Sequence, residues 1–286
     1  AILYATTKNM LKDEIIHSDI INDEYLSQYI EDAFPESLFV RYSHFMYQHK
    51  LRNEIISTQI GSRLVTDMGI IFVYQMVEET GANLARICRA YVVSSQIFQL
   101  NHWIRLANQL DYKVSPEIKY ELLLYFSGLV RRSSRWMLRK YRDNMDCRSL
   151  VTQFSDIISK IQEKLPKLLM GDLKQSAAEH KQRFLDEHVP ESVADHVSSL
   201  DALFHMLNIA EVAFKHDKID IFDMAKFYFT MMDRLDLHWF RQQIDTYPID
   251  TKWAILARSG FKSELDNLQC HLLSSILAFE SNKQTT

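Results

Sequence analysis

Glycine and proline are scarce in this sequence, and their scarcity limits the possible folds more than any other feature. Six of the 286 residues are glycine and five are proline, about 2% of each against the roughly 7% and 5% of average proteins. Sheets joined by tight turns need both residues at fixed turn positions, whereas the interiors of long helices exclude them. We therefore predict an all-α fold with no sheet.

Capping residues stand where helix ends are expected. Asn83 precedes an apolar helical repeat as an N-cap, and Ser115 followed by Pro116 predicts a second helix start. Gly69 and Gly81 follow periodic segments and suit left-handed C-terminal caps. Breaks between helices are expected near residues 35, 69, 81, 113, 143, 166, 190, 217 and 248. These breaks leave roughly ten or more helices in a bundle-like arrangement.

Two later segments predict further helices. Apolar residues recur at helical spacing over residues 193–214 and predict one continuous stripe. The polar residues 170–192 form either a weakly packed hinge or one solvent-exposed helix that ends before Pro190. Of these two, the helix is favoured.

The chain is long and apolar enough for a substantial core. Its hydrophobic content is 47%, which suffices for one large core or two modest ones. No fixed-period repeat occurs, so a solenoid is not indicated. We predict a single domain over residues 1–286, and the pattern is also compatible with sub-lobes of about 1–142 and 143–286.

Cysteine usage and apolar runs predict a cytoplasmic protein with no membrane partner. Cys88, Cys147 and Cys270 are far apart and odd in number, as expected of reduced thiols. The first residues lack the basic and then apolar pattern of a secretory signal. The longest apolar runs fall well short of the ~20 residues that a membrane span needs.

Motifs for chemistry are missing from the sequence. It contains no glycine-rich phosphate loop, no G-x-S-x-G and no H-E-x-x-H or C-x-x-C metal motif. A carboxylate-bridged di-iron site needs two Glu-x-x-His motifs, and the chain offers one, Glu14 to His17. Cys270 and His271 are adjacent, so a regular helix that buries Cys270 points His271 elsewhere. We predict no catalytic, cofactor-binding or metal-binding residue in this chain.

Residues 221–240 concentrate aromatic and methionine side chains. A cofactor or hydrophobic-ligand pocket would use such residues, but so does ordinary helix packing, because Met and Phe fill irregular gaps in a core. Packing is the favoured interpretation. The eleven histidines lack a sequence context that would orient any of them as a general base.

Residues 129–142, LVRRSSRWMLRKYR, combine basic and aromatic side chains, as nucleic-acid-binding surfaces do. On a helix, however, the arginines share one arc, Tyr141 lies on the opposite core arc and Trp136 lies on the flank between them. The formal net charge of −4 is also atypical of a nucleic-acid-binding protein.

The arginine arc is instead a candidate interface. Its members are Arg131, Arg132, Arg135, Arg139 and Arg142. The planar guanidinium group suits bidentate pairing with carboxylates. Residues 76–81 (MVEETG) and 31–36 (EDAFPE) could supply carboxylates from within the chain, as could another domain. We predict an intramolecular or inter-domain ion-pair network.

Several segments together resemble the large bacterial NAD-dependent glutamate dehydrogenases. The stretches that carry the resemblance are LRNEIISTQ (51–59), MGIIFVYQMVEETGA (68–82), CRAYVVSSQIF (88–98), LVRRSSRWMLR (129–139), AEVAFKHDKIDIFDMAKFYFTMMDRLDLHWFRQQI (210–244) and TKWAILARSGFKSELDNLQCHL (251–272). They run from about residue 25 to residue 273. In that family they belong to the helical region after the catalytic domain, near the C-terminus of a much longer polypeptide.

The resemblance implies a specific parent enzyme. It would oxidatively deaminate L-glutamate to 2-oxoglutarate and ammonium in amino-acid catabolism, with NAD as hydride acceptor. The family's catalytic lysine and aspartate and its Rossmann glycines belong to the preceding domain and have no matching position here. The resemblance therefore implies a non-catalytic C-terminal domain whose partner is the catalytic domain of the same polypeptide, in a homo-oligomer.

Two other functions stay open from the sequence. The first is a free-standing helical adaptor or nucleic-acid-binding regulator that uses residues 131–142. The second is regulation of the parent enzyme by an effector, for which the sequence names no ligand.

Overall fold

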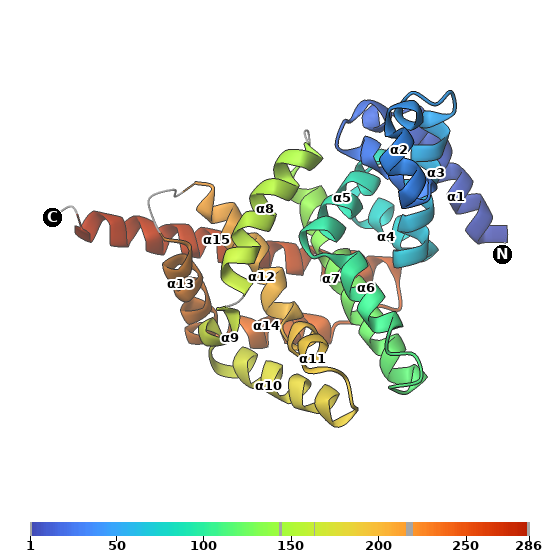
Figure 1. Cartoon of the computed structure of the whole chain (residues 1–286). Coiled ribbons are helices and arrows are strands. Elements are labelled where there is room, and N and C mark those ends of the chain that lie inside the picture. The colour runs from blue at the N-terminus through green and yellow to red at the C-terminus, as the bar shows by residue number, and fades with distance from the viewer. Residues whose placement is uncertain (1, 143–144, 163, 216–219, 285–286) are drawn as a thin grey trace. The chain divides into compact units, whose positions relative to one another are not determined.

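A computed structural model describes residues 2–142, 145–162, 164–215 and 220–284 of the chain (Figure 1). Within these residues it contains fifteen α-helices, two 3-10 helices and no strand. The predicted all-α fold is therefore confirmed. No helix in this described part of the chain combines the length and apolar character that a membrane crossing requires.

The helices form two compact units. The first comprises Ala1–Phe98 and Val130–Val151, and the second comprises Gln99–Leu129 and Thr152–Thr286. The sub-lobes considered from the sequence divide the chain once, near residue 142. The grouping in the structure differs, because residues 99–129 belong with the later part of the chain. Helix α7 (Pro116–Lys140) contributes residues to both units.

The first unit is built around α3 and α5. Its elements are α1 (Ile2–Ile16), the 3-10 helices η1 (Asp19–Asn22) and η2 (Leu26–Ala33), α2 (Glu36–Tyr47), α3 (Arg52–Met68), α4 (Ile70–Thr80), α5 (Leu84–Ile97) and the second part of α7. Helix α3 contacts α1 and η2 and buries Ile56, Ile60 and Leu64 completely.

The second unit is built around α12. Its elements are α6 (Leu100–Asn108), the first part of α7, most of α8 (Cys147–Gln162), α9 (Leu165–Leu168), α10 (Gly171–Asp186), α11 (Glu191–Ser198), α12 (Leu200–Ala213), α13 (Ile221–Arg234), α14 (Leu237–Asp245) and α15 (Lys252–Gln284). Helix α12 contacts both α13 and α15. Since it is apolar on almost every side, it is the central element of this core.

Local capping chemistry determines several helix ends as predicted. Asn83 Oδ1 accepts a 2.9 Å hydrogen bond from the Arg86 amide, and α7 begins at Pro116 directly after Ser115. Gly81 ends α4 in the left-handed conformation, with φ 67° and ψ 12°. Gly69 also has a positive φ of 75°, but its ψ of 161° is extended, so it joins α3 directly to α4 instead of forming the expected left-handed cap.

Two expected helices differ in extent. The stripe over residues 193–214 is divided between α11 and α12, because Ser199 adopts φ −96° and ψ 0° between them. Residues 171–186 form α10, which confirms the helix over the hinge for most of residues 170–192. The break expected near residue 166 falls inside the short helix α9.

Candidate functional site

Arg135, from the predicted arginine arc, forms an ion pair inside the first unit. Its guanidinium group contacts both carboxylate oxygens of Glu79 on α4, with Nη2 3.1 Å from Oε1 and Nε bonded to Oε2. The side chains are 19% and 5% exposed, respectively. Glu79 belongs to the acidic stretch MVEETG, so this arginine finds its carboxylate within the chain.

The other arginines of the arc have different environments. Arg131 Nε is buried and has no hydrogen-bond partner in the described part of the chain. Burial together with the nearby charge of Arg135 lowers the pKa of the Arg131 side chain. Arg132 and Arg139 are half-buried, whereas Arg142 is exposed. The arc is therefore not one solvated face, and a role for it at an interface stays a prediction.

Trp136 is buried, at 4% exposure, so the flank of α7 on which the helical spacing places it is packed as well. The reason is that the neighbouring serines behave as core residues. Ser133 Oγ donates to the Val130 carbonyl within α7, and Ser134 Oγ donates 3.4 Å to the Ala90 carbonyl of α5. Both hydroxyls are satisfied without water, which widens the buried side of α7 beyond its apolar stripe. Base stacking needs exposed aromatic faces, and Trp136 does not offer one.

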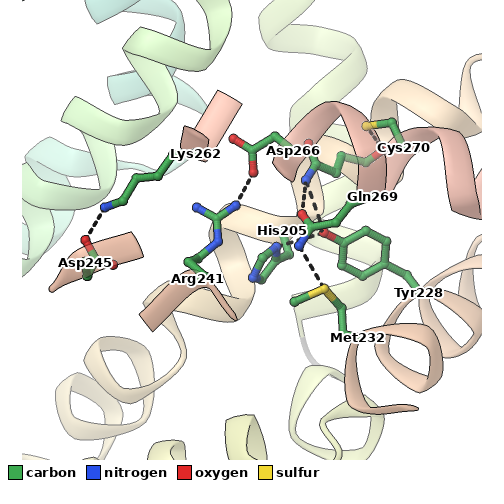
Figure 2. A network of polar contacts seen from close by, with 10 residues as sticks. His205, Tyr228, Met232, Arg241, Asp245, Lys262, Asp266, Gln269 and Cys270 are labelled. Carbon is green, nitrogen blue, oxygen red and sulfur yellow. Dashed lines mark hydrogen bonds and ion pairs between the residues drawn. The ribbon is translucent and has the colours of Figure 1, made fainter. Parts of the chain in front are cut away.

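The second unit contains a buried polar network centred on Tyr228, shown in Figure 2. The Tyr228 hydroxyl lies 2.9 Å from His205 Nδ1, 3.1 Å from Asn208 Nδ2 and 2.9 Å from Gln269 Oε1. Asn208 Nδ2 also donates to Gln269 Oε1 at 3.1 Å, and Gln269 Nε2 contacts Met232 Sδ at 3.0 Å. The network thus links α12, α13 and α15.

The donors and acceptors of the network determine one another. The phenol has a single proton, which it donates to Gln269 Oε1, because that carbonyl oxygen can only accept. The phenol oxygen then accepts from Asn208 Nδ2, and it must also accept from His205 Nδ1. His205 Nδ1 is therefore the protonated nitrogen in this arrangement.

Charged residues of α14 and α15 lie beside this network (Figure 2). Arg241 pairs with Asp266, and each side chain is 11% exposed. Asp245 accepts from both Lys262 and Arg258. Burial lowers the pKa of the Lys262 ammonium group, opposed by its bond to Asp245. These pairs connect α14 to the first half of α15.

The network suits a structural role better than proton transfer. Burial raises the pKa of the Tyr228 phenol well above its ordinary value, so the phenol holds its proton at neutral pH. The sequence did not reveal this network, because bonded members such as Asn208 and Gln269 are separated by 61 residues. One signal was present in the sequence, because His205 and Asn208 are polar residues that fall among the apolar, buried positions of α12.

The aromatic segment at residues 221–240 is largely core, as favoured. Met224, Tyr228, Phe229 and Met232 are buried. Phe222 and Phe227 are half-buried, and Trp239 and Phe240 on α14 are at least half exposed.

Phe240 borders an apolar groove between α14 and α15. Phe240, Tyr247, Phe261 and Leu268 line it while remaining 46–51% exposed. Gln243, Ile244, Glu264 and Leu265 complete the lining of the groove, whose volume is about 470 Å³. Large apolar side chains gathered at this exposure are typical of a surface that another protein segment covers.

The described residues contain no group of three or more His, Cys, Asp or Glu side chains that could hold a metal ion. Cys270 is buried on α15 while His271 is exposed, as predicted for this adjacent pair.

Comparison with known proteins identifies the family. The family described as "Glutamate dehydrogenase, C-terminal" matches residues 1–286. The chain is 35% identical over 280 residues to the NAD-specific glutamate dehydrogenase of Pseudomonas aeruginosa, and 32% identical over 280 residues to that of Halomonas elongata. Each match covers 98% of this chain but 17% of the relative, so the chain spans about a sixth of the length of these relatives. The chain therefore belongs to the family of C-terminal domains of glutamate dehydrogenases.

Proposed function

We propose that this chain is the non-catalytic C-terminal helical domain of an NAD-dependent glutamate dehydrogenase. The parent enzyme would convert L-glutamate to 2-oxoglutarate and ammonium while reducing NAD. The domain would pack against the catalytic part of the same polypeptide and support the homo-oligomer. The family match over residues 1–286 and the names of the relatives support the parent activity.

The apolar groove between α14 and α15 is the observation that carries the docking role. Phe240, Tyr247, Phe261 and Leu268 each leave about half of a large apolar side chain in contact with solvent, which is unfavourable in proportion to the apolar area. About five sixths of the length of the relatives lies outside the matched stretch. That remainder of the polypeptide is the occupant that we assign to the groove. Among the described residues that line the groove, Glu264 is the one that carries a charge, so we expect an apolar segment with a cation at its edge.

The buried polar groups of the domain are paired with one another, which also supports a structural role. Tyr228, Asn208 and Gln269 bond one another, and Arg241 is bound to Asp266. These groups stabilise the packing of α12–α15. Binding of NAD and the chemistry at glutamate would then belong to the catalytic part of the enzyme.

The arginine arc provides a second proposed contact. Arg135 is paired with Glu79, but Arg131 Nε is buried without a hydrogen bond to any described residue, and Arg142 is exposed. Carboxylates of the catalytic domain or of a neighbouring subunit would complete this side of α7, since an unpaired buried donor lowers stability.

The groove is tested in the whole enzyme by replacing Phe261 and Leu268 together with serine. We expect a lower thermal midpoint and weaker oligomer assembly, because the variant loses the apolar contact with the catalytic part. The matched control is Tyr112→Ser, at a fully exposed aromatic residue outside the groove. Equal midpoints and oligomer masses for the double variant and the unmodified enzyme would overturn the docking role.

The non-catalytic assignment is tested separately. Residues 1–286, expressed alone, should produce no NADH from glutamate and NAD, while the whole enzyme does. Glutamate-dependent NADH production by residues 1–286 would refute it.

A further inference from the structure

A second hollow lies within the second unit, away from the α14–α15 groove. Helices α9, α10 and α11 and the side chain of Trp103 from α6 enclose a cleft of about 580 Å³. Helices α10 and α11, yellow and gold in Figure 1, contact each other along one side of it. This volume is within the range of about 300–1,000 Å³ that is typical of sites for small molecules.

The wall of the cleft includes an aromatic stack. The rings of Trp103 and His196 lie parallel, with centroids 3.5 Å apart and an angle of 7° between their planes. His196 is 6% exposed, and burial lowers the pKa of its imidazole to about 3, so the ring is neutral. Its Nδ1 is buried and has no hydrogen-bond partner among the residues that the structure describes. Buried polar atoms are rarely left unpaired in a wall that serves packing alone.

Apolar and cationic groups meet in this cleft. Leu165 and Leu169 form one side, and Ala177 of α10 forms another. Two lysines of α10 also line it. Lys181 is paired with Glu191 at 3.1 Å and with Asp195, which also lines the cleft, at 2.7 Å, so its charge is neutralised. Lys174 lies seven residues earlier, on the same side of the helix.

Lys174 is exposed and has no ion-pair partner among the described residues. The cleft therefore combines an apolar side, a polar side that includes Gln162, Ser192 and Ser199, and the ammonium group of Lys174. An apolar hollow with a few convergent polar groups is the usual form of a small-molecule site.

We propose that this cleft binds a small carboxylate with an apolar body. Lys174 pairs with the carboxylate group, while the apolar body lies against Leu165, Leu169 and Ala177 beside the edge of Trp103. The Trp103–His196 stack stiffens the wall that the ligand contacts. A ligand with the opposite charge cannot pair with Lys174, and a ligand without the apolar body loses the contacts with Leu165, Leu169 and Ala177. The proposal concerns binding alone and does not rest on the docking role of the α14–α15 groove.

The test is calorimetric titration of the whole enzyme with sodium hexanoate, with saturating glutamate present and NAD absent, so that the substrate site is occupied. Hexanoate should bind at least tenfold more tightly than acetate, which lacks the apolar body. It should also bind at least tenfold more tightly than hexylammonium, which carries the opposite charge. Lys174→Glu should weaken hexanoate binding at least tenfold. Lys226→Glu, at an exposed lysine of α13, is the matched control and should leave the affinity unchanged.

A second variant tests the apolar wall. Ala177→Phe places a ring in the cleft and should abolish hexanoate binding, with an unchanged circular dichroism spectrum as the check on folding. Lys174 is exposed, so we expect Lys174→Glu to fold normally. If Ala177→Phe does not fold, Lys174→Glu still tests the proposal. Undetectable hexanoate binding would overturn the proposal. Equal affinity for hexylammonium, or full affinity in Lys174→Glu, would overturn it as well.

Discussion

The Tyr228 hydroxyl donates a 2.9 Å hydrogen bond to Gln269 Oε1 and thereby joins α13 to α15 in the core of the second unit. The same hydroxyl oxygen accepts from Asn208 and His205 on α12. One phenol group thus satisfies polar atoms from two other helices, and its side chain is fully buried.

Replacing this tyrosine should destabilise the chain without a large change in volume. Tyr228→Phe removes the hydroxyl but keeps the ring, which leaves Asn208, His205 and Gln269 each short of a partner. We expect the free energy of unfolding to fall by about 1–3 kcal/mol, measured by urea denaturation. Tyr120→Phe is the matched control, because Tyr120 is 64% exposed. Coincident denaturation curves for Tyr228→Phe and the unmodified chain would show that the network does not stabilise the fold.

The Arg135–Glu79 pair gives a second prediction, in the first unit. Arg135→Ala leaves the Glu79 carboxylate, 5% exposed, without its bidentate partner, and should lower the free energy of unfolding by about 1–3 kcal/mol. Arg142→Ala, at the exposed end of the same arc, should change it by less than about 0.5 kcal/mol. The comparison uses chemical denaturation of both variants. If the two variants lose the same stability, the ion pair has no special role.

Stability should also depend on pH through His196. Its folded pKa is lowered from 6.5 to about 3 by burial, so the unfolded chain binds a proton below pH 6.5 that the folded chain does not. Stability is therefore fully present above pH 6.5 and falls as the pH drops toward 3. His196→Phe keeps a ring against Trp103 but cannot titrate.

Between pH 7 and 5.5, the unmodified chain should lose about 1 kcal/mol more stability than His196→Phe. Denaturation curves at the two pH values measure this difference. A difference near zero would mean that the imidazole titrates normally in the folded chain.

Two glycines should respond to alanine with opposite signs. Gly81 has φ 67°, and an added Cβ would meet no atom within 4 Å, so Gly81→Ala should cost about 1–2 kcal/mol through backbone strain alone. Gly128 lies inside α7 with equally open space around it. Gly128→Ala should stabilise the chain by about 0.5–1 kcal/mol. Thermal unfolding of the two variants checks both signs, and a stabilised Gly81→Ala would contradict the assigned cap.

Local chemistry explains which parts of the fold were predictable from the sequence. The positions of Asn83, Ser115 and Gly81 depend on neighbours within a few residues, so the sequence alone was enough to predict helix ends there. Ser199 was different, because its backbone (φ −96°, ψ 0°) breaks the helix inside an apolar repeat that reads as continuous.

Tertiary contacts explain what could not be predicted. Trp136 is buried because Ser133 and Ser134 also lie in the core, and a serine in a sequence does not show whether its hydroxyl will find a carbonyl in another helix. Similarly, Arg135 finds Glu79 across 56 residues of sequence. The acidic stretch that supplies this partner was one of two candidates, and the sequence could not distinguish them.

The docking of this domain on the catalytic part of the same polypeptide is tested most directly by photo-crosslinking of the whole enzyme. A benzophenone amino acid replaces Phe261 in the α14–α15 groove in one sample and Tyr112 in a control sample, and the crosslinked peptides are identified by mass spectrometry. We predict that position 261 crosslinks to peptides from the polypeptide outside residues 1–286, whereas position 112 does not. Crosslinks from position 261 only to residues 1–286, or none at all, would contradict this account.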